Sequence, residues 1–197
     1  MWDMEISYGA NVADDGELRL CGDLNGKRAI ELGVSSPANA VVMALQGAKA
    51  IAVDSDPKAI TGLRAAAERA EVSVECHEGD LADLGFATSA SVDLVVSRGS
   101  VYFWDDLNAA FRETARVLRP GGMAFIGGGF GNAELRDRIV PAMAERKPGW
   151  EDFYHANMSR ETTDRLRQAS SGIDGVACQV HDDDSGVWVV MKRGEIP

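Results

Sequence analysis

Residues 28–33 read Arg-Ala-Ile-Glu-Leu-Gly, and this stretch decides the fold that the sequence predicts. It is a short apolar run that ends in a glycine and precedes a helix-forming segment, as a buried strand of a parallel sheet does. Similar runs recur along the chain, separated by segments rich in Ala, Leu, Arg and Glu. This alternation predicts an α/β protein with helices on both faces of the sheet. The further strands are expected at residues 50–53, 72–76, 92–96 and 123–126, and the helices at 38–46, 58–70 and 107–118.

The end of the chain has a different pattern. Two strand-like runs, 176–180 and 187–191, are joined by the polar stretch 181–186 and predict an antiparallel hairpin. Earlier in the chain, Pro120 and the two glycines after it are expected to end the helix at 107–118 and turn the chain into the next strand. No repeat or linker divides the sequence, so a single domain is predicted over residues 1–197.

The composition narrows the choice of partners. Lys and Arg number 20 and Asp and Glu 31, which gives a formal charge of −11. A chain this acidic lacks the basic surface that nucleic acid binding needs. No apolar run approaches the roughly 20 residues that cross a bilayer, and the first residues do not form a signal peptide. The sequence therefore predicts a cytoplasmic protein without nucleic acid or membrane partners, and it leaves a homodimer open.

Neither the cysteines nor the histidines predict a metal site. Cys21, Cys76 and Cys178 are far apart and show no Cys-x-x-Cys spacing, so they are expected to be reduced and mostly buried. His181 and the three aspartates after it could form a metal site, but consecutive residues converge poorly on one ion. A solvated turn is the favoured interpretation of that stretch.

Ligands of open parallel sheets bind beyond the carboxyl ends of the strands, so the residues after each apolar run are the most informative. After the first strand, Ser36 is expected to cap a helix whose first residue is Pro37. The free N–H groups of that helix end would suit a carboxylate or a phosphate. A capped helix without any ligand is an equally good interpretation.

Acidic residues follow the second and third strands. Asp54 can accept hydrogen bonds from both hydroxyls of a ribose. Because Asp56 and Pro57 already cap the next helix, Asp54 is expected to have no structural role. Asp80 follows the third strand and could accept a hydrogen bond from an adenine amino group, although Gly-Asp is also an ordinary turn pair.

An aromatic cluster follows the fourth strand. Tyr102 and Trp104, close to the cation Arg98, can wall a pocket that holds a sulfonium or a planar group, which makes them candidate substrate contacts. Packing between a helix and the edge of the sheet explains the same aromatics equally well.

Together these motifs resemble those of the class I S-adenosylmethionine-dependent methyltransferases, over about residues 26–130. The matching segments are 31–33 for the glycine loop, 53–54 for the ribose acid, 79–81 for the adenine motif, 92–99 for the central strand and 116–122 before the fifth strand. The resemblance implies a Rossmann-like three-layer sandwich with a seven-stranded, mostly parallel sheet and an antiparallel C-terminal hairpin. It also implies S-adenosylmethionine as the cofactor and methyl transfer as the activity.

The resemblance assigns cofactor contacts to residues near the strand ends and to one N-terminal aromatic: Tyr8, Glu31, Gly33, Ser35, Asn39, Asp54, Ser55, Asp80, Leu81 and Ser97. The glycine loop departs from the family pattern, because Ser35 and Pro37 stand where glycines usually let the backbone approach the cofactor closely. The loop is therefore expected to hold the cofactor differently or more weakly. Hydrogen bonds from serine hydroxyls and from Asn39 could replace the close approach.

Candidate catalytic groups are His155 and Arg98. The stretch 150–157 falls between the fifth strand and the hairpin, on the expected acceptor side, so His155 is the candidate general base. A lone histidine is more often a surface or packing residue. Arg98, with Arg136 and Arg138, could attract an anionic acceptor, whereas exposed arginines commonly serve solubility alone.

Two segments are expected to cover the site. Residues 1–25 would close over the cofactor or else be a disordered end, and residues 131–168 would form a helical cover on the acceptor side. Little chain is left for an acceptor domain, so the predicted acceptor is a small molecule, methylated on oxygen or nitrogen. The alternative function is a protein of this fold without turnover, which binds S-adenosylmethionine or a partner as a regulatory module.

Overall fold

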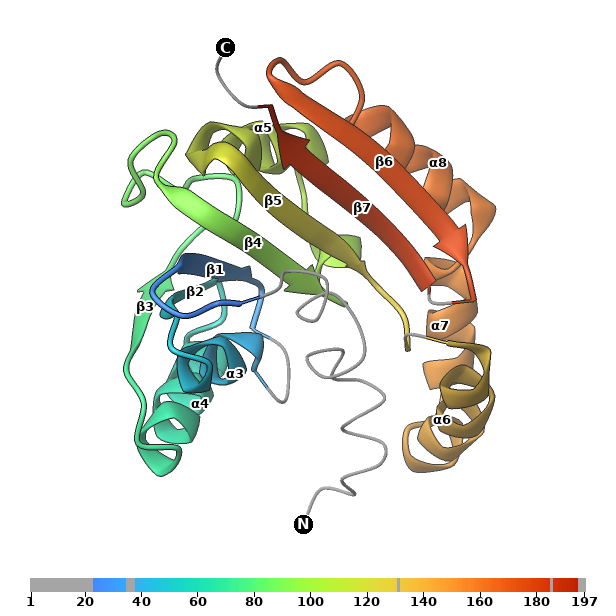
Figure 1. Cartoon of the computed structure of the whole chain (residues 1–197). Helices are drawn as coiled ribbons and strands as arrows, with labels where there is room; N and C mark the ends of the chain where they lie inside the picture. Colours follow the sequence, from blue (N-terminus) through green and yellow to red (C-terminus); the bar gives the residue numbers. More distant parts are fainter. Residues whose placement is uncertain (1–22, 35–37, 131, 185, 195–197) are drawn as a thin grey trace.

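The computed structural model (Figure 1) describes residues 23–34, 38–130, 132–184 and 186–194. Its strands are β1 (Arg28–Leu32), β2 (Lys49–Asp54), β3 (Val74–Glu78), β4 (Val92–Arg98), β5 (Leu118–Gly128), β6 (Val176–Asp183) and β7 (Gly186–Arg193). Its helices are α3 (Asn39–Leu45), α4 (Pro57–Arg69), α5 (Leu107–Val117), α6 (Ala133–Arg146), α7 (Trp150–Asn157) and α8 (Arg160–Ala169), with a short 3-10 helix, η1 (Val101–Phe103).

The strands form one sheet in the order β3-β2-β1-β4-β5-β7-β6. Among the described strands, β7 alone runs in the opposite direction, and it pairs antiparallel with β5 and β6. Helices lie on both sides of the sheet (Figure 1). The predicted seven-stranded, mostly parallel sheet with an antiparallel C-terminal hairpin is therefore confirmed.

Alternate side chains of the central strands enter two separate cores. On one face, Ala29 of β1 lies in a core with Met43 of α3 and Leu63 of α4. On the other face, Ile30 of β1 lies in a core with Phe111 of α5 and residues of α8. Because both faces are covered, the strands have near-continuous apolar sequences instead of alternating ones. This burial on two sides explains why residues 28–33 predict the fold.

The third strand begins two residues later than predicted. The last turn of α4 continues through Glu71, which has a φ of +55°, to Val72, whose N–H donates to the carbonyl of Ala67. Val72 therefore lies in the turn that closes the end of α4 and not in β3. The hairpin strands are longer than predicted, and His181, which was expected in the turn, lies in β6 opposite Trp188.

Pro120 does not end α5, contrary to the prediction. The helix ends at Val117, and β5 begins with the next residue. The register with β4 shifts within residues 119–122, so these residues bulge out of the ladder. Pro120 has no N–H to pair, and Gly121 has a φ of +76°, which suits both residues to a bulge.

Candidate functional site

The carboxyl ends of β1, β2 and β4 meet at one edge of the sheet and are hydrogen-bonded to one another. The N–H of Gly33, just after β1, donates to the carbonyl of Val53 in β2 at 2.8 Å. The hydroxyl of Ser100, just after β4, donates to the carbonyl of Leu32 in β1 at 2.9 Å. β1 and β4 are neighbours from which the strand order diverges, and open α/β sheets bind ligands at such a switch point.

Asp54, the last residue of β2, links two loops at this edge. Its Oδ2 accepts a hydrogen bond from the N–H of Val34 at 2.7 Å, and its Oδ1 accepts one from the N–H of Asp56 at 2.8 Å. The expectation that Asp54 has no structural role is therefore wrong. Because each carboxylate oxygen can accept a second hydrogen bond, the side chain is fixed in place and still able to bind a ligand.

Glu31, which is buried in β1, fills the N-terminus of α3. Its Oε1 accepts from the N–H of Asn39 at 3.0 Å, and its Oε2 accepts from the N–H of Ala40 at 2.8 Å. Ser36 and Pro37 lie outside the described residues, but the helix begins at Asn39, too late for Ser36 to be its N-cap. The carboxylate of Glu31 thus occupies the helix end for which an anionic ligand and a capped end without a ligand were equally expected.

Asn39, the first residue of α3, has a fully buried side chain. Neither its amide nitrogen nor its amide oxygen has a hydrogen-bond partner among the described residues. An unsatisfied buried polar group costs about 1–3 kcal/mol, so such a group commonly marks the place of a water or a ligand. Asn39 offers one donor and one acceptor group to a molecule bound at this edge.

Ser100 joins β1, β4 and η1, although the sequence motifs did not identify it. Its Oγ lies 2.7 Å from the Oγ of Ser97 and accepts a hydrogen bond from the indole N–H of Trp104 at 3.1 Å. A Cβ built on Gly33 would lie 2.2 Å from the same atom, so the glycine loop passes directly against it. The hint in the sequence is its position directly after an apolar strand and a glycine, Gly99.

The aromatic residues after β4 are packed against the protein. Trp104 is buried, and its ring centroid lies 6.1 Å from that of Phe111 in α5. Tyr102 lies against the end of β5, where a Cβ on Gly128 would be 2.6 Å from its hydroxyl, and burial raises the pKa of that hydroxyl. Arg98 is buried at the end of β4. Packing explains these aromatics without a ligand, and their roles and that of Arg98 stay predictions.

The end of β3 joins the same edge through the backbone, because the N–H of Gly79 donates to the carbonyl of Asp54 at 3.0 Å. Asp80 is exposed, and its Oδ1 accepts from the N–H of Ala82 at 2.8 Å, as in an ordinary turn. The described residues predicted to contact a cofactor all lie at this edge: Glu31, Gly33, Asn39, Asp54, Ser55, Asp80, Leu81 and Ser97. The other two, Tyr8 and Ser35, lie outside the described residues.

A cavity of about 330 Å³ lies at the same edge, beyond the end of β5 and the beginning of β7. We call it the Phe130 cavity. His155 is at its rim, with about two thirds of its side chain exposed, and its ring meets that of Tyr154 edge-on at a centroid distance of 5.4 Å. Its Nε2 lies 3.8 Å from a carboxylate oxygen of Glu151. The candidate general base thus lines a cavity, and its role stays a prediction.

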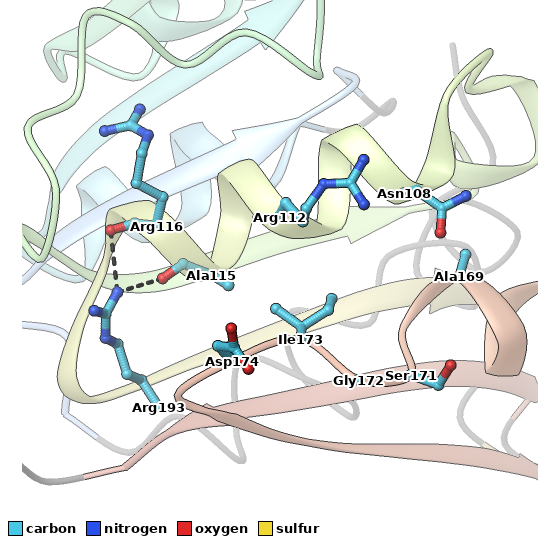
Figure 2. Close-up of a pocket in the computed structure, with 10 residues that line it drawn as sticks. All are labelled: Asn108, Arg112, Ala115, Arg116, Ala169, Ser171, Gly172, Ile173, Asp174 and Arg193. Atoms are coloured by element: carbon cyan, nitrogen blue, oxygen red, sulfur yellow. Dashed lines mark hydrogen bonds between the residues drawn. The ribbon is translucent and has the colours of Figure 1, made fainter.

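A second cavity, also of about 330 Å³, lies where the C-terminus of α5 meets the end of β7 (Figure 2). The guanidinium of Arg193 donates to the carbonyls of Ala115 at 2.5 Å and of Arg116 at 3.2 Å. These carbonyls belong to the end of a helix, where they have no partner within the helix. This cavity is at the opposite edge of the sheet from the strand ends described above.

The remaining predictions concern cysteines, metals and membranes. Cys76 and Cys178 are free and half-buried, and burial raises the pKa of both thiols, while Cys21 lies outside the described residues. Within the described part of the chain, no three His, Cys, Asp or Glu side chains gather as metal ligands would. None of the described helices combines the length and the apolar character that crossing a membrane requires.

Comparisons with known proteins agree with this geometry. The family model described as a methyltransferase domain matches residues 30–126. The chain is 31% identical to the cypemycin N-terminal methyltransferase of a Streptomyces species over 106 residues. This match covers 52% of this chain and 42% of that protein. The chain is 29% identical to the ubiquinone biosynthesis O-methyltransferase of Xanthomonas oryzae pv. oryzae over 104 residues. This match covers 53% of this chain and 44% of that protein. The chain thus covers less than half the length of these two relatives.

A solved structure is similar over nearly the whole chain. It is the crystal structure of a proposed S-adenosyl-L-methionine-dependent methyltransferase from Methanococcus maripaludis, with a TM-score of 0.80 and 28% identity. The match covers 98% of this chain and 86% of that one. With the methyltransferase domain at residues 30–126 and the strand-end motifs gathered at one edge of the sheet, the chain contains a methyltransferase domain with the fold and motifs of the class I S-adenosylmethionine-dependent methyltransferases.

Proposed function

We propose that this protein transfers the methyl group of S-adenosylmethionine to a small-molecule acceptor. The observation that carries the proposal is the carboxylate of Asp54 at the end of β2, which two backbone N–H groups fix beside the switch point of the sheet. The methyltransferase domain supports the choice of cofactor. The Phe130 cavity, at about 330 Å³, is of the size that suits a small molecule and supports the choice of acceptor.

The described residues fit this cofactor chemically. Asp54 would accept hydrogen bonds from the ribose hydroxyls, and Asp80 would accept one from the adenine amino group. The buried amide of Asn39, which has no partner among the described residues, would bind the polar amino-acid end. When bound, the cofactor supplies a methyl group already activated by the positive charge on its sulfur.

The remaining work of the protein is to position the acceptor and to remove a proton. Alignment of two reactants in one site lowers the barrier because the entropy of bringing them together has been lost on binding. His155 lines the Phe130 cavity and is the proposed proton acceptor. The names of the two curated relatives state an N-terminal and an O-linked acceptor, so they leave the acceptor atom open.

Binding of S-adenosylmethionine to an Asp54→Asn variant tests the proposal. The substitution removes the charge and one acceptor oxygen, so the affinity measured by calorimetry should fall at least tenfold, about 1.4 kcal/mol. The matched control is Asp56→Asn two residues away, which keeps an oxygen able to cap α4 and should leave the affinity within about twofold.

Equal affinity in the wild type and the Asp54→Asn variant would remove the ribose assignment. If the wild type binds neither S-adenosylmethionine nor S-adenosylhomocysteine, the proposed function itself is wrong. The alternative of a protein without turnover was motivated by Ser35 and Pro37, which lie outside the described residues. No contact within the described part of the chain favours that alternative.

A further inference from the structure

The Phe130 cavity has an excess of negative charge. Among the described residues that line it, three carry carboxylates, at 182–184, and one, Arg136, carries a guanidinium. With His155 neutral, these side chains leave a net charge of −2. The expected attraction of an anionic acceptor by arginines therefore finds no support in this cavity.

The charge of Arg136 is already balanced within the protein. Its Nε lies 2.8 Å from a carboxylate oxygen of Asp137, and its Nη1 lies 2.8 Å from one of Asp184. Both hydrogen bonds raise the pKa of Arg136, so it stays charged. An anion entering the cavity would have to compete with two carboxylates for this guanidinium.

Among the carboxylates of the Phe130 cavity, that of Asp182 is held by a hydrogen bond, and it has no cationic partner among the described residues. Its Oδ2 accepts a hydrogen bond from the hydroxyl of Thr163 at 3.0 Å, and Thr163 is itself buried in α8. The other oxygen of Asp182, Oδ1, has no hydrogen-bond partner in the described part of the chain. A positioned carboxylate with an open oxygen in a cavity is suited to bind an ammonium group.

Aromatic rings form another wall of the same cavity. The ring centroids of Phe130 and Tyr154 are 5.7 Å apart, and Tyr154 stacks on Trp150 at 5.7 Å with an angle of 12° between the planes. The faces of such rings attract cations and also pack against apolar groups. Rings and carboxylates together favour a molecule that has an apolar body and a positive end.

We propose that the acceptor is an amine with an apolar body and that Asp182 binds its ammonium group. This inference rests on the proposed function. Before transfer the ammonium gives up one proton, which His155 at the rim is placed to accept. The neutral nitrogen then forms a bond to the methyl carbon while the carbon–sulfur bond breaks and its electron pair stays on sulfur. The products are a methylated ammonium, which Asp182 again stabilises, and S-adenosylhomocysteine.

Three probes that share one phenylethyl body and differ in their charged end test this inference. They are phenethylamine, 2-phenylethanol and 3-phenylpropionate, titrated into the full chain by calorimetry with and without saturating S-adenosylhomocysteine. Phenethylamine should bind at least tenfold more tightly than either of the others. In an Asp182→Asn variant that preference should fall at least tenfold, while the affinity for S-adenosylhomocysteine should stay unchanged.

The matched control is Asp174→Asn, which removes a carboxylate from the cavity at the opposite edge (Figure 2) and should leave all affinities unchanged. If phenylpropionate or phenylethanol binds as tightly as the amine, if none of the three binds, or if Asp182→Asn has no effect, the amine inference is overturned. The proposed function survives each of these results as long as S-adenosylhomocysteine binds. Absence of that binding overturns the proposed function and with it the acceptor role, whereas amine binding in the cavity is judged separately because it is also measured without S-adenosylhomocysteine.

Discussion

Gly33 has a φ of +72°, and a Cβ built on it would lie 2.2 Å from the Oγ and 2.3 Å from the Cβ of Ser100. Two separate requirements therefore demand glycine here, the conformation of its own backbone and the close approach of a serine from another strand. The same serine hydroxyl donates to the carbonyl of Leu32. The loop after β1 is thus placed by contact with β4.

Substitution of two glycines separates these requirements. Gly26 has a similar φ of +74° but has no atom within 4 Å of a built Cβ. Gly26→Ala should cost about 1 kcal/mol for the backbone conformation alone. Gly33→Ala should cost about 1–3 kcal/mol more, because Ser100 must move. The free energy of unfolding in urea measures both, and equal losses would show that the Ser100 contact does not constrain the loop.

At this scale, the sequence predicted the positions of site residues better than their contacts. Gly33 and Asp54 were found because each follows a local apolar run, which can be recognised within a few residues. The partners of Asp54 and of Glu31 could not be found in this way, because they are backbone N–H groups of separate loops and helices. Ser100 was missed because its importance comes from Leu32, which lies 68 residues away.

Among the elements, α5 is attached to the loop that follows β3 by hydrogen bonds of two of its side chains, Arg116 and Glu113, which also form an ion pair with each other. Arg116 is bonded to Glu113 at 2.7 Å, and it also donates to the carbonyls of Leu84 and Ala87, both at 3.0 Å. Glu113 accepts from the N–H of Leu84 at 3.1 Å. The hydrogen bond from Arg116 is the main cause that lowers the pKa of Glu113. The loop after the adenine motif is therefore held by charged groups.

This attachment predicts a dependence on pH. Because folding lowers the pKa of Glu113, its carboxylate stabilises the protein above its unfolded pKa of about 4.3, and the stabilisation is lost as the pH falls through the folded value. Glu113→Gln should therefore lower the melting temperature at pH 7 and have progressively less effect below about pH 4.3. Glu68→Gln, at an exposed position of α4, is the control, and a pH-independent effect of Glu113→Gln would contradict the prediction.

The order of the strands and of the helices between the parallel strands followed from the sequence, whereas several boundaries did not, and two of them are instructive. Val72 reads as a strand residue because it is apolar and β-branched, but its N–H completes the last turn of α4. Pro120 reads as the end of a helix, but the structure uses it in a bulge of β5. Both errors have one cause, which is that local preference cannot show which hydrogen bonds the rest of the fold provides.

For the molecule as a whole, the C-terminal hairpin is bound to the parallel part of the sheet by more than its pairing with β5. Arg193, the last residue of β7, donates to two carbonyls at the end of α5 (Figure 2). Those carbonyls lie just before β5, the strand with which β7 of the hairpin pairs. One side chain therefore connects the last strand to the end of α5.

Arg193→Met should weaken this connection. Loss of hydrogen bonds from a charged group costs roughly 1.5–3 kcal/mol, and amides of β6 and β7 should exchange with solvent faster than in the wild type. Lys192→Met changes the neighbouring exposed residue and should leave the exchange rates unchanged. Hydrogen exchange followed by mass spectrometry resolves the hairpin, and equal rates in the two variants would show that Arg193 does not anchor it.

The Phe130 cavity also bears on how such proteins diversify. The methyltransferase family model ends at residue 126, and every described residue that lines the cavity comes at or after Phe130. The segment that the methyltransferase model matches and the described residues that line this cavity therefore lie in consecutive pieces of one chain with no overlap. Inherited changes in the second piece can alter the molecule that is recognised while the first piece stays under its own selection. The turn after β5 is accordingly a natural place to graft the C-terminal segment of one relative onto another.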